Sequence, residues 1–214
     1  MKKFAVILSG SGVFDGSEIH ETTLSMYAIR KQGATYDVFA PDMDQYHVVN
    51  HITGEVMDET RNVLVESARI ARGNIKPLKE FDANAYDVLL LPGGFGAAKN
   101  LSTFAFDGPD CKVQPEVEKA IKDMHKAGKP IAALCIAPAI LAKVLGDVKL
   151  TIGQDKETAD AITSLGATHE TTDHGQVIID EKNKVFTTPC YMLEADIVQI
   201  GDGAENIVRA LLKA

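Results

Sequence analysis

A short apolar run that turns directly into a helix, within residues 130–145, constrains the fold more than any other part of the chain. Residues 131–134 have the composition of a buried strand. Cys135 ends this run, and Pro138 suits the first turn of a following helix that stops before Gly146. The segment therefore predicts a strand–turn–helix unit, which is the building block of α/β sheets.

Small residues flank the cysteine in this turn. Ala133 and Ala137 stand two positions before and two after Cys135, where a nucleophile elbow of the G-x-S-x-G type carries its glycines. Such a turn projects the sulfur from the sheet edge and directs helix N–H groups and the positive end of the helix dipole toward it. Both effects favour thiolate, so the pattern predicts a lowered pKa for Cys135. A buried structural cysteine is the alternative that the local pattern leaves open.

Strand and helix patterns alternate along the rest of the chain. The predicted strands cover residues 4–8, 35–40, 86–91, 130–134, 149–152, 176–180 and 185–188. The predicted helices cover residues 18–32, 60–72, 115–127, 138–145, 158–165 and 193–212, the last with an interruption near residues 201–203. Residues 48–56 are predicted as a hairpin and residues 101–113 as a loop. This order predicts one α/β domain over residues 1–214, with a mostly parallel sheet and helices on both faces.

Composition excludes several functional classes. The net charge is -8 and the pI is about 5.2, which disfavours a nucleic-acid-binding surface. No apolar run approaches the ~18 residues that a membrane span needs, so no membrane partner is expected. The three cysteines have no regular spacing, which predicts reduced thiols and a cytoplasmic protein.

Three segments with reactive or small residues are expected to meet at one edge of the sheet, because ligands of open α/β sheets bind outside the carboxyl ends of the strands. The loop and helix after the first strand supply Glu18 and Glu21, the third predicted strand is followed by Pro92–Gly94, and Cys135 ends the fourth. A nucleophile, an acid–base carboxylate and backbone N–H donors are the components of covalent catalysis on a carbonyl. Taken singly, the glycines could be a plain turn and the glutamates an acidic first helical turn.

Two long motifs and the cysteine turn resemble a known family. Residues 91–94 (LPGG) and 133–138 (ALCIAP) resemble the DJ-1/PfpI superfamily, whose members share a flavodoxin-like, glutamine-amidotransferase-like fold. Residues 12–21 (GVFDGSEIHE) and 92–102 (PGGFGAAKNLS) are similar to its ES1 branch, the bacterial "enhancing lycopene biosynthesis" proteins that are also described as glyoxalases. The resemblance covers nearly the whole chain.

The resemblance also implies roles for individual residues. It makes Cys135 the nucleophile and Glu21 the catalytic carboxylate, with Glu18 as the alternative one helical turn away. It places Gly93 and Gly94 at the oxyanion and substrate-binding position, together with Ile136. A homodimer without cofactor or metal is expected. The resemblance implies a small dicarbonyl substrate, with glyoxal as the first candidate. The protein would convert glyoxal to the hydroxy acid through a hemithioacetal with Cys135. A link to isoprenoid biosynthesis is implied as well.

Two departures from the wider family narrow the activity. Protease-like members carry histidine directly after the cysteine, where this chain has Ile136. Glutaminases carry a late His-Pro-Glu motif, whereas the late histidines here, His169 and His174, lie in no such motif. Peptidase and glutaminase activities are therefore disfavoured.

Two alternatives to an enzyme of this kind remain. One is a redox-sensing or chaperone-like protein whose Cys135 is oxidised rather than catalytic. The other is nucleotide binding, because Gly10-Ser11-Gly12 with Gly16 resembles a dinucleotide fingerprint, although its spacing is G-x-G-x-x-x-G.

Overall fold

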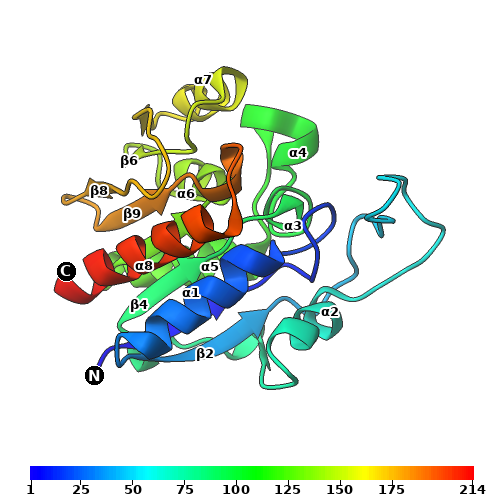
Figure 1. Ribbon diagram of the computed structural model, residues 1–214, viewed down its shortest axis with the longest axis horizontal. Coiled ribbons are helices and arrows are strands. Elements are labelled where there is room, and N and C mark those ends of the chain that lie inside the picture. Colours follow the sequence, from blue (N-terminus) through cyan, green and yellow to red (C-terminus); the bar gives the residue numbers. More distant parts are fainter.

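A seven-stranded sheet organises the protein, as a computed structural model of residues 1–214 shows (Figure 1). The strands are β1 (Lys3–Ile7), β2 (Thr35–Ala40), β3 (Lys76–Pro77), β4 (Val88–Leu91), β5 (Ile131–Leu134), β8 (Ile178–Asp180) and β9 (Val185–Thr188). Their order is β3-β2-β1-β4-β5-β9-β8, and every neighbouring pair is parallel except β8 with β9. This is the flavodoxin-like, mostly parallel α/β fold that the sequence predicts.

The central strands are apolar along their whole length because both faces of the sheet are covered. Every residue of β4 and β5 is buried, as are the last four of β1. Full burial of one such aliphatic side chain contributes about 1.5–3 kcal/mol. The three strands thereby form a rigid base whose carboxyl ends lie at one edge of the sheet.

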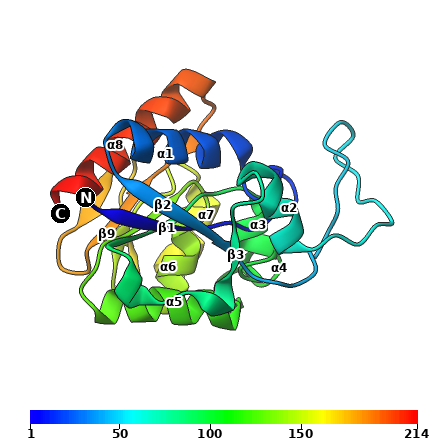
Figure 2. The same ribbon diagram turned by 90° about the horizontal axis from the view of Figure 1, so that it is seen from below.

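Helices cover the sheet on both faces (Figure 2). They are α1 (Ile19–Lys31), α2 (Val63–Ile70), α3 (Phe95–Lys99), α4 (Phe104–Asp107), α5 (Pro115–Lys126), α6 (Pro138–Leu145), α7 (Lys156–Ser164) and α8 (Ile197–Lys213). Helices α1 and α8 lie side by side on one face, and α5 and α6 cover the other. Each face of the sheet has its own hydrophobic core. Polar side chains are therefore placed at the edges of the sheet, between the two layers of helices.

Three sequence predictions about local structure are wrong. Helix α8 is not interrupted near residues 201–203, because Gly203 is buried on the inner face of the helix. The helix begins at Ile197, because Asp196 and Gln199 form a capping box. Residues 101–113 contain the short helix α4, since hydrogen bonds between Thr103 and Lys112 fold this loop back on itself. The strand predicted at residues 149–152 is present as β6 (Lys149–Leu150), but it does not join the main sheet and pairs instead with β7 (Thr168–His169) in a separate two-stranded sheet.

Residues 42–62 form an arm that projects away from the sheet (Figures 1 and 2). The hairpin predicted here is reduced to a single antiparallel bridge between Val49 and Val56. The arm is attached to the body through Asp15, whose Oδ2 accepts a hydrogen bond from the Val49 N–H at 2.7 Å. None of the helices combines the length and apolar character that crossing a membrane requires.

Candidate active site

Cys135 occupies the turn between β5 and α6 in a strained backbone conformation. Its φ is +58°, a region that non-glycine residues rarely adopt and that costs about 1–3 kcal/mol. The Cys135 N–H donates to the Thr188 carbonyl of β9 at 3.0 Å, which holds the turn against the sheet. Ala133 and Ala137 are fully buried on either side. The nucleophile-elbow geometry predicted from these small residues is therefore confirmed.

Glu21 lies against the sulfur. It is in the first turn of α1 and is fully buried. Its Oε2 accepts a hydrogen bond from the Gly93 N–H at 2.9 Å, and its Oε1 accepts one from the Tyr191 N–H at 3.3 Å. The Cys135 thiol is next to this carboxyl, because a Cβ on Gly93 would lie 2.6 Å from the Glu21 Oε2 and 3.0 Å from the Cys135 Sγ. Segments that follow β1, β4, β5 and β9 thus converge on one carboxyl–thiol pair.

Glu18 occupies a different position from Glu21. It is the N-cap of α1, and its Oε2 accepts a hydrogen bond from the Glu21 N–H at 2.7 Å. Of the two candidate carboxylates, the structure therefore brings Glu21 to the thiol and leaves Glu18 at the start of the helix. The proton-shuttle role of Glu21 stays a prediction, now with the contact that it requires.

Gly93 is a position where only glycine fits. A Cβ atom there would lie 2.3 Å from the Cys135 Cβ and 2.6 Å from the Glu21 Oε2. The Gly93 N–H is already engaged by Glu21. Gly93 therefore brings the carboxyl and the thiol together, which differs from the predicted oxyanion or substrate-binding role.

The N–H groups of Gly94 and Ile136 favour the charged form of the Cys135 thiol and so act to lower its pKa, and their role as oxyanion donors stays a prediction. Gly94 has a φ of +93°, and a Cβ there would come within 2.4 Å of the Gly16 carbonyl oxygen. The loop after β1 and the turn after β4 are thus packed backbone to backbone. These two N–H groups are fixed by the fold before any substrate binds.

Burial changes the charge of this pair. Loss of hydration and the neighbouring Glu18 raise the pKa of Glu21 from 4.5 to about 8. Burial and the Glu21 carboxyl raise the pKa of the Cys135 thiol well above its ordinary value, although the Gly94 and Ile136 N–H groups oppose this change. The lowered pKa predicted for Cys135 is therefore wrong, because desolvation and a like charge outweigh the helix terminus. At neutral pH the pair is protonated, and its first proton is lost near pH 8.

Sequence reasoning missed Tyr191 and His20. The Tyr191 N–H donates to the Glu21 carboxyl, and the Tyr191 hydroxyl lies 2.8 Å from the Nδ1 of His20, which is exposed. The sequence signal for His20 was its position next to Glu21 in the motif of residues 12–21. Tyr191 follows Cys190, whose loop does return to this edge, but nothing in the local sequence showed that its backbone would bind the carboxyl.

The remaining candidates have structural roles or lie apart. Cys190 is buried with a φ of +43°, and burial together with Glu21 raises the pKa of its thiol. His169 is the last residue of β7, and it accepts a hydrogen bond from the Ile152 N–H at 3.3 Å. His174 lies 3.9 Å from Asp173 in the loop before β8.

The loop after β1 is closed by hydrogen bonds within the loop and by one to helix α2. The Gly12 N–H donates to Ser17 O at 2.9 Å, the Gly16 N–H to Gly12 O at 2.7 Å, and the Gly10 N–H to Ser67 Oγ at 2.9 Å. A phosphate cradle needs free N–H groups, so this arrangement argues against the dinucleotide alternative. No group of three or more His, Cys, Asp or Glu side chains is placed to hold a metal ion.

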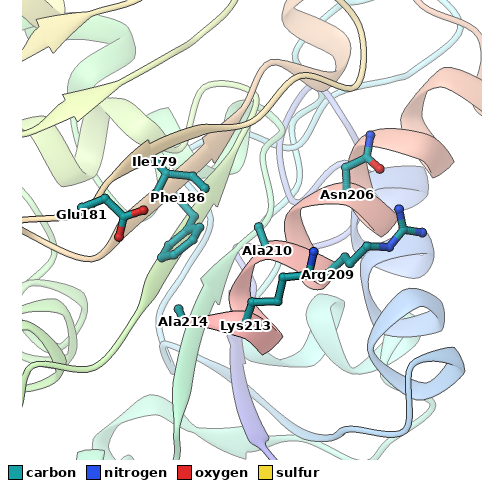
Figure 3. Close-up of a pocket in the computed structure, with 8 residues that line it drawn as sticks. All are labelled: Ile179, Glu181, Phe186, Asn206, Arg209, Ala210, Lys213 and Ala214. Atoms are coloured by element: carbon teal, nitrogen blue, oxygen red, sulfur yellow. The ribbon is translucent and has the colours of Figure 1, made fainter.

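A cleft of about 390 Å³ lies between strands β8 and β9 and the last turns of helix α8 (Figure 3). It is lined by Ile179, Glu181, Phe186, Asn206, Arg209, Ala210, Lys213 and Ala214. Lys2, next to β1, donates through its Nζ to the Ala214 carbonyl, which places the cleft at the amino ends of the parallel strands. Catalytic residues of open α/β sheets gather at the carboxyl ends, where Cys135 lies.

Comparison with known proteins identifies the family of this chain. Residues 12–188 match the model of the DJ-1/PfpI family. The chain is 48% identical to the human glutamine amidotransferase-like class 1 domain-containing protein 3, mitochondrial, over 99% of this chain and 82% of that protein. It is 37% identical to the ES1 protein, mitochondrial, of Danio rerio, over 98% of this chain and 84% of that protein. The chain belongs to the DJ-1/PfpI family, and the resemblance to its ES1 branch is confirmed.

Solved structures agree with this assignment. An isoprenoid biosynthesis protein with an amidotransferase-like domain from Ehrlichia chaffeensis is 34% identical, with a TM-score of 0.92 over 99% of each chain. Its name agrees with the link to isoprenoid biosynthesis that the sequence implies. Glyoxalase III from Candida albicans shares the fold, with a TM-score of 0.62, 17% identity and coverage of 100% and 97% of the two chains.

The cytoplasmic location expected from the cysteines is contradicted by these relatives. A third relative, the ES1 protein homolog of Rattus norvegicus, is 47% identical over 99% of this chain and 83% of its own length. This protein and the human and Danio rerio proteins are all named as mitochondrial. Unpaired cysteines indicate a reducing environment and do not distinguish one reducing compartment from another.

Proposed function

We propose that this protein is a cofactor-independent glyoxalase that converts glyoxal and related dicarbonyls to hydroxy acids. One observation carries the proposal: the buried Glu21 carboxyl, with a pKa of about 8, lies next to the Cys135 thiol across Gly93. The N–H groups of Gly94 and Ile136 point to the same sulfur. A nucleophile, a proton carrier tuned near working pH and two fixed N–H donors are what addition to an aldehyde requires.

The first step uses the pair after it has lost one proton. The Glu21 carboxylate takes the thiol proton as the Cys135 sulfur adds to one aldehyde carbon, and it then passes this proton to the new alkoxide oxygen. The N–H groups of Gly94 and Ile136 stabilise the negative charge on that oxygen as it develops. The product is a hemithioacetal, and Glu21 becomes a carboxylate that can act as a base.

The second step moves hydrogen between the two carbons of the substrate. Glu21 removes the proton from the hemithioacetal carbon, which gives an enediol, and then returns it to the neighbouring carbon. The hydroxyl proton on the first carbon passes to the oxygen on the second. A Cys135 thioester of the hydroxy acid results, and water hydrolyses it to the free acid and the thiol. Glyoxal plus water thus gives glycolate, and no outside oxidant or reductant is needed.

A steady-state assay with glyoxal and methylglyoxal tests this proposal. We expect Cys135→Ser to abolish turnover and Glu21→Gln to lower kcat by on the order of 10²-fold or more, the usual scale for general acid–base catalysis. Cys111→Ser is the matched control, since Cys111 is a buried cysteine outside the site, and it should keep wild-type activity. Turnover that survives Cys135→Ser would refute the mechanism. Absence of turnover in the wild type would leave the redox-sensing alternative.

The homodimer implied by the family resemblance is part of the same proposal. Sedimentation velocity at several protein concentrations tests it, with a species of twice the chain mass of 23.1 kDa as the expected result. A monomer at all concentrations would contradict it.

A further inference from the structure

The two oxygens of the Glu21 carboxyl are held by backbone N–H groups from different segments. Oε2 accepts a hydrogen bond from the Gly93 N–H at 2.9 Å, and Oε1 accepts one from the Tyr191 N–H at 3.3 Å. Gly93 is fixed in place, because its backbone lies against Glu21 and Cys135 with no room for a side chain. The Tyr191 contact is longer than the usual N–H···O distance of about 2.7–3.2 Å, so a small displacement of Tyr191 would break it.

Tyr191 lies in a short 3-10 turn, residues Cys190–Met192, between β9 and α8. The first N–H groups of a helical turn have no partner within the turn, which leaves the Tyr191 N–H free for the carboxyl. Two backbone hydrogen bonds of 3.0 and 3.2 Å close the turn, one from the Met192 N–H and one from the Leu193 N–H. A turn this short depends on tertiary contacts to keep its position.

The Tyr191 side chain supplies such a contact, because it reaches back to helix α1 and meets His20. The hydroxyl lies 2.8 Å from the His20 Nδ1, and the centroids of the two rings are 5.9 Å apart. His20 directly precedes Glu21, so the helix that carries the carboxyl also holds the residue that supplies the Oε1 donor. A neutral Nδ1 accepts from the hydroxyl and a protonated Nδ1 donates to it, so the contact forms in either protonation state of the imidazole.

We propose that Tyr191 is a positioning residue for Glu21: its hydroxyl, bound to His20, fixes the turn after β9 so that the Tyr191 N–H stays on the Glu21 Oε1. The inference rests on the proposed role of Glu21 as the proton carrier and adds a residue that acts through it. A hydrogen bond from an N–H group favours a carboxylate over the neutral acid. Burial and Glu18 raise the pKa of Glu21 to about 8, and the Tyr191 N–H opposes them. Without this hydrogen bond, Glu21 would release its proton only at a higher pH.

The other titratable groups around Glu21 come from three elements, and the test leaves them unchanged. They are Glu18 at the start of α1, Cys135 in the β5–α6 turn and Cys190 beside Tyr191. Burial, Glu18 and Glu21 raise the pKa of the Tyr191 hydroxyl, so this hydroxyl stays protonated while Glu21 titrates. A change in the pKa of Glu21 after removal of the hydroxyl therefore reports the hydrogen bond from the Tyr191 N–H.

The experiment removes the His20–Tyr191 contact from each side. Tyr191→Phe deletes the hydroxyl and keeps the ring, and His20→Leu deletes the partner, so that one variant remains if the other fails to fold. His20→Asn keeps an acceptor near the position of Nδ1 and is the conservative variant. Tyr27→Phe makes the same change at an exposed tyrosine of α1 and is the matched control. Two readouts are followed from pH 5 to pH 10. One is the carbon-13 resonance of the Glu21 carboxyl, identified by its absence in Glu21→Gln, and the other is kcat/KM for glyoxal.

We expect Tyr191→Phe and His20→Leu to raise the pKa of Glu21, and the midpoint of the pH–rate profile with it, by about half a unit to one unit. Two or three backbone N–H bonds lower the pKa of a carboxyl by about two units, and one of them is lost here. At pH 7 this shift corresponds to a loss of about threefold to tenfold in kcat/KM. His20→Asn and Tyr27→Phe should resemble the wild type. The double variant should shift the pKa no further than either single variant, because both remove the same contact.

An unchanged pKa of Glu21 in Tyr191→Phe and His20→Leu would overturn the inference. So would a loss of kcat/KM that is equal at every pH, since a merely structural role lowers activity without moving the midpoint. A shift in only one of the two single variants would show that the contact between them is not its cause, which also overturns the inference. Absence of turnover in the wild type would overturn the glyoxalase proposal alone, because the carboxyl resonance still decides whether Tyr191 positions its N–H on Glu21.

Discussion

Glu21→Gln should change how the stability of the protein depends on pH. The Glu21 carboxyl has a pKa of 4.5 when exposed and about 8 in the folded protein, where burial and Glu18 disfavour its charged form. The folded state therefore holds a proton that the unfolded state releases between these two values. Since the folded pKa is raised, the associated stability is fully present below pH 4.5 and is lost as the pH rises to about 8.

The magnitude follows from the two pKa values. The difference between about 8 and 4.5, at about 1.36 kcal/mol for each pH unit, corresponds to about 5 kcal/mol. About 4 kcal/mol of this falls between pH 5 and pH 9. Water that enters the site when the carboxylate forms would lower this figure, so it is an upper value. A glutamine at this position stays neutral throughout and can still accept the Gly93 hydrogen bond.

Urea denaturation at pH 5, 6.5, 8 and 9 measures the effect as the free energy of unfolding of wild type minus that of Glu21→Gln. We expect this difference to fall by several kcal/mol as the pH rises, a large part of the ~5–15 kcal/mol that stabilises a typical domain. Glu194→Gln, at an exposed glutamate, controls for the substitution itself. A difference that stays constant from pH 5 to pH 9 would show that Glu21 is not a buried neutral carboxyl, and the reasoning about the site would fail.

Three further predictions follow from the same site. The kcat/KM for glyoxal should rise as the pH passes through about 8, because the Cys135–Glu21 pair must lose one proton. Glu18→Gln should move the midpoint of this pH–rate profile to lower pH, because it removes the negative charge next to Glu21. Gly93→Ala should lower turnover by on the order of 10²-fold or more, since its Cβ would overlap Cys135 and separate the pair; near-normal activity would contradict this. Graded peroxide followed by mass spectrometry should oxidise Cys135 only slowly at neutral pH, because burial and the Glu21 carboxyl raise the pKa of its thiol and keep it protonated; oxidation of Cys135 ahead of Cys111 at neutral pH would be the contrary result.

Elements with complete local signals were predicted from the sequence almost residue by residue. Strands β2 and β9 and helix α6 have the predicted bounds, because apolar runs or a helix-starting proline are enclosed by breakers close in sequence. The elbow could be predicted for the same reason, since Ala133, Cys135 and Ala137 lie within five residues. The arm at residues 42–62 and the short helix α4 carry weaker patterns, and contacts distant in the chain decide their conformation.

The sequence alone determined the fold class, the cysteine turn and the pair of glutamates from which the partner of Cys135 would come. Only the tertiary structure decided that Glu21 faces the sulfur while Glu18 caps the helix, that Gly93 serves as a spacer, and that Tyr191 binds the carboxyl. It also reversed the expected change in the pKa of Cys135. The physical reason is that a helix start and its dipole are local features that the sequence shows, whereas desolvation depends on every segment packed around a group. Here those segments follow β1, β4, β5 and β9, far apart in the chain, and their joint effect on charge exists only once they are folded together.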